Sequence, residues 1–329
     1  MPGALWWGPI KRLVALYQYR FEQVRLLLVE PNTEIRQGLL AALRDYGFRN
    51  VATATSEAKV KETLQSSEID LIIGDSHYDG DSVCAAVKNM RHSKLGENPF
   101  TVSIALCSEP LAKNIKTAVD AGFDDVIAKP APVNKIVSRI SRQISDRRKF
   151  VVAHTYVGPD RRKNPRDDDD GRVQIPLLEV PNPLKAIAED GMTHKQIKDQ
   201  ILSARYVIKD RWLLRSAEQL DIFAQQLASH YIYSDAPDKI PMLVRYLDAM
   251  SHELHNRLEG ARKVAASELC VSTIDVTERM AADPKNIQSK DIELLPNLTK
   301  AIVKAFEKDP SKDEVVHDIT RSVLNAAGE

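Results

Sequence analysis

The chain has 329 residues, of which 43% are hydrophobic and 28% are charged, and its acidic and basic side chains balance to a formal net charge of zero. The length allows two domains, and the composition is ordinary for a globular protein. A neutral balance provides no overall basic field, so we expect no nucleic-acid partner. No run approaches the roughly 20 apolar residues that cross a bilayer, so we expect a cytoplasmic protein without a membrane span.

Residues 1–23 lack the features of a signal peptide, and we expect them to form an N-terminal extension. Over residues 24–148, short apolar runs alternate with helical patterns, and Asn32 and Ser56 stand where the first two helices would be capped. The expected strands are 24–29, 50–54, 69–74, 102–106 and 125–128. Because alternating strands and helices form a parallel sheet covered on both faces, we predict a flavodoxin-like, doubly wound α/β domain with five strands.

Polar residues stand at the carboxyl ends of four of these strands. Glu30 follows the first strand, Asp75 the third, Cys107 and Ser108 the fourth, and Lys129 the fifth. In an open parallel sheet, ligands bind at this edge, near the point where the strand order reverses. We therefore expect these side chains to lie together in one site.

The strands and these residues resemble the receiver domains of bacterial two-component response regulators. The resemblance implies that Asp75 accepts a phosphoryl group from a sensor histidine kinase or a phosphotransfer protein. It further implies that Lys129 contacts the phosphate, and that Cys107 or Ser108 takes the hydroxyl position that also contacts it. Mg²⁺ would be held by Asp75 and by the acidic residue after the first strand, here Glu30. A carboxylate nucleophile, a divalent cation and an ammonium group suit this chemistry.

Departures from the family pattern indicate a degenerate receiver domain. Pro31 stands where the family usually has a second acidic residue, so the expected Mg²⁺ binding is weakened. The loop after Asp75 is also shorter than usual, although Asp79 within it is a further candidate Mg²⁺ ligand. An alternative therefore stays open. The domain would then be a pseudo-receiver that is never phosphorylated and serves as an adaptor through protein docking and oligomerisation.

Residues 149–183 interrupt the alternating pattern. Several prolines and adjacent basic and acidic blocks predict an exposed linker, in which 156–162 is either plain linker or a docking strap. Residues 184–329 carry apolar residues at helical spacing throughout, which predicts an all-α output or dimerisation domain. Its apolar stripes would form a bundle core, which a second copy of the chain could complete as a homodimer.

One segment of the helical part, 249–254, contains His252 within Ser-His-Glu-Leu. It resembles the phospho-accepting box of histidine kinases, so His252 is a candidate for phosphotransfer, with an ordinary surface histidine as the other interpretation. No glycine-rich nucleotide-binding domain follows, and we expect no enzyme activity. The sequence thus predicts a response-regulator-like phosphoprotein of a phosphorelay, which receives a phosphoryl group on Asp75 and signals through its helical domain to a protein partner.

Overall fold

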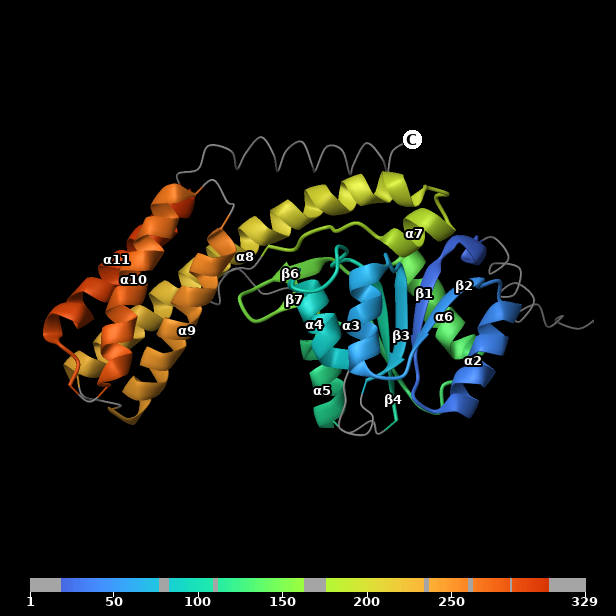
Figure 1. Cartoon of the computed structure of the whole chain (residues 1–329), viewed down its shortest axis with the longest axis horizontal. Coiled ribbons are helices and arrows are strands. Elements are labelled where there is room, and N and C mark those ends of the chain that lie inside the picture. Colours follow the sequence, from blue (N-terminus) through green and yellow to red (C-terminus); the bar gives the residue numbers. More distant parts are fainter. Residues whose placement is uncertain are drawn as a thin grey trace, which may run out of the picture. The chain divides into compact units, whose positions relative to one another are not determined.

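A computed structural model of the chain describes residues 19–76, 83–108, 112–162, 176–233, 237–259, 263–284 and 286–307 (Figure 1). The chain divides into two compact units, Met1–Arg205 and Tyr206–Glu329. Most of the expected N-terminal extension and the last part of the predicted helical domain, residues 308–329, lie outside the described residues.

The first unit is built on a five-stranded parallel sheet with the order β2-β1-β3-β4-β5. The strands are β1 (Arg25–Val29), β2 (Asn50–Ala54), β3 (Leu71–Asp75), β4 (Val102–Cys107) and β5 (Asp125–Ala128). This order confirms the predicted doubly wound fold. The three central strands are almost entirely apolar and buried, as expected of a sheet that is covered on both faces.

Five helices cover the two faces of this sheet. α2 (Thr33–Asp45) and α6 (Val133–Ser145) contact each other on one face, and α3 (Glu57–Ser66), α4 (Val83–Arg91) and α5 (Ala112–Asp120) lie on the other (Figure 1). The predicted caps are present: Asn32 Oδ1 accepts from the backbone N–H of Ile35, and Ser56 Oγ accepts from that of Lys59. Each cap satisfies one of the backbone donors that a helix start leaves without a partner.

The chain after α6 differs from a plain exposed linker. β6 (Phe150–Val152) and β7 (Val157–Pro159) form an antiparallel hairpin. Phe150 is fully buried, and the guanidinium carbons of Arg91 and Arg147 lie 5.2 and 5.0 Å from the centroid of its ring. Phe150 thus gains burial together with two cation–π contacts, and the hairpin is part of the first unit.

A close backbone contact also fixes this hairpin. A Cβ atom on Gly158 would lie 2.9 Å from the Cα of Gly122, a separation that real Cβ atoms essentially never show. Segment 156–162 therefore lies against the turn before β5, and Gly122 and Gly158 permit the approach. α7 (Pro183–Ala188) follows, capped by Asn182, and contacts α6 and the short helix η1 (Phe21–Gln23).

α8 (His194–Tyr233) begins in the first unit and continues into the second. The compact units divide at Arg205 and Tyr206, whereas the sequence placed a domain boundary at 183/184. The second unit also contains η2 (Pro237–Lys239), α9 (Ile240–Leu258), α10 (Val264–Ala282) and α11 (Ser289–Glu307).

The second unit is a four-helix region, as the all-α prediction required. Its core takes large apolar side chains from each helix, including Trp212, Leu220, Leu247, Leu254, Met280 and Phe306. Polar contacts also join the helices: the Thr299 hydroxyl donates to Asp221, and the Tyr231 hydroxyl donates to the carbonyl of Ile287. Among the helices that the structure describes, none is long and apolar enough to cross a membrane.

Candidate functional site

Glu30, Asp75, Ser108 and Lys129 meet at the carboxyl edge of the sheet. Asp75 is the last residue of β3, while Glu30, Ser108 and Lys129 directly follow β1, β4 and β5. Lys129 Nζ lies 2.7 Å from both Asp75 Oδ2 and Glu30 Oε2, and Ser108 Oγ donates to Asp75 Oδ2 at 2.9 Å. An ammonium group thus bridges two carboxylates, and a hydroxyl contacts one of them.

Backbone hydrogen bonds position these side chains by extending the strand ladders past the last strand residue. The Lys129 N–H donates to the carbonyl of Cys107 at 2.9 Å, and the Ser76 N–H donates to the carbonyl of Leu106 at 2.8 Å. Asp75 and Lys129 are therefore held at fixed registers beside β4. The parallel register, and not a flexible loop, sets the distance between the ammonium group and the carboxylate.

The site combines buried acidic groups with a cation of limited exposure. The carboxylates of Glu30 and Asp75 are 2% and 5% exposed, and the Lys129 side chain is 17% exposed. Burial alone would lower the pKa of Lys129, but hydrogen bonds and attraction from Asp75 and Glu30 outweigh it and raise this pKa. Lys129 is therefore a permanent ammonium group at neutral pH, available to pair with anionic oxygens.

The two carboxylates suit Mg²⁺, which commonly binds one or two carboxylates and keeps several waters. Pro31 contributes no side-chain oxygen, and its carbonyl accepts from Arg36 Nη1 at 3.1 Å. Among the described residues, no group of three or more His, Cys, Asp or Glu side chains could hold a metal ion. Glu30 and Asp75 are thus the described residues that would hold it, while Asp79 lies outside the described part of the chain.

The two candidates after β4 occupy different positions. Ser108 is exposed and its hydroxyl reaches Asp75, whereas Cys107 is the last residue of β4 and is 1% exposed. The side chains of neighbouring residues in an extended chain point to opposite sides. Cys107 and Ser108 are neighbours, so their side chains point in different directions. Of these two candidates, the structure brings the hydroxyl of Ser108 to the carboxylate of Asp75.

His252, the other predicted phosphotransfer residue, belongs to the second unit. Its side chain is 44% exposed on α9, and Nε2 lies 3.3 Å from Glu278 Oε1 and 3.8 Å from Asp248 Oδ1. Asp248 Oδ1 also accepts from the Thr277 hydroxyl at 3.1 Å. A half-exposed histidine beside two acidic groups is compatible with either of the two interpretations of this residue.

Sequence reasoning missed Arg36, which holds the loop after β1. Its Nη1 donates to the carbonyls of Glu30 and Pro31, and its Nη2 donates to the Thr33 hydroxyl. Arg36 lies one turn inside α2, where the chain turns back over the end of β1. The available signal in the sequence was a basic residue, Arg36, six positions after the acidic residue Glu30 that follows the first strand.

Comparison with known proteins identifies the first unit. Residues 26–141 match the family of response regulator receiver domains. This part of the chain is thus the receiver domain of a response regulator, a component of two-component signalling, and a helical region follows it. The comparison with curated proteins gave no significant match.

Several solved structures resemble part of the chain, each covering less than half of it. The response regulator DrrB of Thermotoga maritima is 16% identical with a TM-score of 0.34, and the match covers 39% of this chain and 56% of that one. The chemotaxis regulator CheY4 of Vibrio cholerae is 23% identical with a TM-score of 0.33, covering 36% of this chain and 98% of its own.

A third similar structure contains a complex from Saccharomyces cerevisiae, formed by the histidine phosphotransfer protein Ypd1 and the receiver domain of its downstream regulator Ssk1. The matched chain is 21% identical with a TM-score of 0.32, and the match covers 36% of this chain and 88% of that one. These likenesses concern the receiver fold.

Proposed function

We propose that the protein receives a phosphoryl group on Asp75 and passes the resulting change through its helical unit to a protein partner. The donor would be a phosphohistidine of a sensor histidine kinase or a phosphotransfer protein. The protein would act in this phosphorelay as an acceptor and not as an enzyme. The observation that carries the proposal is the convergence of Lys129 and Ser108 on one carboxylate oxygen of Asp75.

In the proposed reaction, a carboxylate oxygen of Asp75 attacks phosphorus, the bond between phosphorus and the histidine nitrogen breaks, and the freed imidazole takes up a proton. Lys129 and Ser108 now contact Asp75 Oδ2, so they lie where the oxygens of a phosphoryl group on Asp75 would be. The ammonium group would pair with these oxygens, and the hydroxyl would donate to one of them.

Glu30 and Asp75 would hold Mg²⁺ in this proposal. When bound, the ion neutralises negative charge on the transferred group and on the carboxylates around it. Pro31 leaves fewer protein ligands than a second acidic residue would provide, so we expect weak affinity. Glu30 would then have two partners in turn, Lys129 in the absence of the ion and the ion when it binds.

A pseudo-receiver adaptor is the second candidate function, favoured by Pro31 and by the ion pairs of Lys129. Because Lys129 pairs with both carboxylates, each of them has a cationic partner without phosphate or metal. Such an adaptor would act by docking and by oligomerisation of its helical unit, including formation of a homodimer. It would have no need for Mg²⁺.

Intact-mass measurement after incubation with acetyl phosphate and Mg²⁺ separates the two functions. We expect one phosphoryl adduct on the wild type and none on Asp75→Asn. Asp120→Asn serves as the control, because Asp120 is an exposed carboxylate on α5 paired with Lys116, and it should label like the wild type. Label that persists in Asp75→Asn would refute the assignment of Asp75. A folded wild type that takes no label from acetyl phosphate or from a phosphorylated phosphotransfer protein would favour the adaptor.

A further inference from the structure

The first three turns of α8, residues 194–205, lie in the first unit against the amino edge of the sheet, opposite to the edge that carries Asp75. We call this segment the α8 root. Its start is fixed by Thr193 and Gln196: the Thr193 N–H and hydroxyl both donate to Gln196 Oε1 at 2.8 Å. This reciprocal cap holds the helix start in one place.

Charged side chains join the α8 root to the receiver domain. Lys198 Nζ lies 2.9 Å from Glu97 Oε2 and 3.2 Å from Glu68 Oε1. His194 Nε2 lies 3.0 Å from Asp70 Oδ2, which also accepts from the backbone N–H of Arg25. The network has six members, namely Arg25, Glu68, Asp70, Glu97, His194 and Lys198.

Two of the acidic members, Glu68 and Asp70, are anchored in the receiver independently of the root. Glu68 accepts from Arg25 Nη1 at 2.7 Å, and this hydrogen bond is the first cause of its lowered pKa. Asp70 directly precedes β3, and its backbone donates to the carbonyl of Arg25 and accepts from Val102. This part of the acidic surface therefore exists without α8, and the α8 root adds Lys198 and His194 to it.

The contact is mixed rather than purely polar. Ile197 and Ile201, on the same side of the root as Lys198, are 3% and 7% exposed. Apolar burial does not depend on salt, whereas ion pairs near water weaken as salt rises. A high salt concentration should therefore weaken the contact between the α8 root and the receiver domain without detaching the root.

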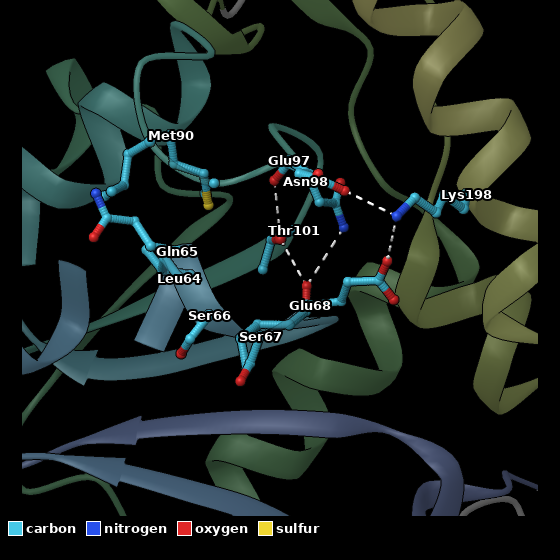
Figure 2. Close-up of a pocket in the computed structure, with 13 residues that line it drawn as sticks. Leu64, Gln65, Ser66, Ser67, Glu68, Met90, Glu97, Asn98, Thr101 and Lys198 are labelled. Carbon is cyan, nitrogen blue, oxygen red and sulfur yellow. Dashed lines mark hydrogen bonds and ion pairs between the residues drawn. The ribbon is translucent and has the colours of Figure 1, made fainter. Parts of the chain in front are cut away.

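A pocket of about 230 Å³ beside Lys198 keeps these ion pairs accessible. Figure 2 shows Lys198 reaching across from α8 to Glu97 and Glu68, with Ser66, Ser67 and Gln65 further along the pocket. The Lys198 side chain is 45% exposed, and those of Glu68 and Glu97 are 36% and 64% exposed. Small ions and water can reach both pairs, so the pairs are screened by salt.

We propose that this network is an electrostatic latch that ties the α8 root to the receiver domain and opens without unfolding the sheet. The latch would control whether residues 194–205 of α8, which connect the receiver domain to the helical unit, are held against the receiver domain or released from it. The inference does not depend on phosphorylation of Asp75. Asp75 lies at the other end of β3 from the acidic residues of the latch.

Hydrogen–deuterium exchange of the full chain, followed by mass spectrometry, tests the latch in peptides that cover 197–205. Lys198→Glu replaces two attractions with two repulsions, so we expect exchange about tenfold faster in the root. Lys195→Glu is the matched control, with the same charge change on an exposed residue three positions earlier in the same helix. A glutamate near a helix start stabilises it through the helix dipole, so faster exchange cannot arise from that effect.

Two further measurements make the test independent of one substitution. In the wild type, raising NaCl from low concentration to about 0.5 M should speed exchange in the root several-fold, because the Debye length falls well below 10 Å. Adding Glu97→Lys to Lys198→Glu restores one ion pair and should slow exchange again. Peptides from β3 report whether the sheet stays folded.

The proposal is overturned if Lys198→Glu exchanges like Lys195→Glu in the root, or if the double variant exchanges no more slowly than Lys198→Glu. It is also overturned if the wild-type root exchanges at the same rate at both salt concentrations. Coincident loss of protection in the root and in β3 would also refute it, because the root would then open only with the whole domain.

Discussion

Lys129→Met tests the electrostatics of the site around Asp75 most directly. The substitution keeps an unbranched side chain of similar length and removes the ammonium group. In the wild type this group lies 2.7 Å from oxygens of both Glu30 and Asp75. The variant leaves two buried carboxylates next to each other without a cation between them, which is the arrangement that proteins tolerate least.

The size of the effect follows from burial. Removing one partner of a buried ion pair destabilises a protein by about 3–5 kcal/mol. Because Lys129 is 17% exposed and water reaches the edge of the sheet, the lower limit of about 3 kcal/mol applies here. Lys116→Met is the control, since Lys116 makes one exposed ion pair with Asp120 and its loss should change stability little.

Mg²⁺ should reverse part of this loss. If Glu30 and Asp75 bind Mg²⁺, the ion must compete with the Lys129 ammonium group for these carboxylates in the wild type but not in Lys129→Met. A ligand at one hundred times its dissociation constant stabilises the folded state by about 2.7 kcal/mol. Urea unfolding with and without Mg²⁺ measures this, and we expect a clearly larger gain in Lys129→Met than in the wild type. Equal gains in both proteins, or none in the variant, would contradict a cation site formed by Glu30 and Asp75.

Two predictions concern the buried cluster formed by Asp124, Arg91, Arg147 and Phe150. Asp124→Asn should lower the free energy of unfolding by about 3–5 kcal/mol at pH 7, because Asp124 is buried between Arg91 and Arg147. Burial alone would raise the pKa of Asp124, but attraction from Arg147 and Arg91 lowers it below its ordinary 3.8. The stability advantage of the wild type over Asp124→Asn should thus persist down to about pH 3.8 and shrink below it, because the carboxylate is then protonated. Urea unfolding of both proteins across this pH range measures the change. Phe150→Ala should destabilise by about 3–5 kcal/mol in the same assay. Its control is Leu177→Ala, 41% exposed, and equal effects would mean that the hairpin is not part of the receiver fold.

The receiver fold and the members of its site were accessible from the sequence because both depend on local patterns. Apolar runs of strand length end on Glu30, Asp75 and Lys129, and parallel strands bring their carboxyl ends to one edge. The choice between Cys107 and Ser108 was not accessible. It depends on where β4 ends to within one residue, and patterns do not locate element ends that finely.

The hairpin after α6 was not accessible for another reason. Phe150 lies among charged residues, and its burial depends on Arg91 and Arg147. Arg91 ends α4, where a surface position would be expected, yet it is fully buried and donates to the carbonyls of Gly122, Pro99 and Thr101. Partners so distant in the sequence leave no local pattern. Likewise, the stripe of Ile197 and Ile201 predicts a helix but does not indicate which unit it packs against.

The segment that follows β7 and the α8 root both attach at the amino edge of the sheet. The hairpin contacts the turn before β5 through Arg161, which donates to the carbonyl of Phe123, and the α8 root contacts the residues before β3. Asp75 lies at the other edge, at the opposite end of β3 from the residues that the α8 root contacts, so among the described residues neither attachment covers it. In the proposed phosphotransfer, a donor protein would therefore approach Asp75 at the edge that these attachments leave open.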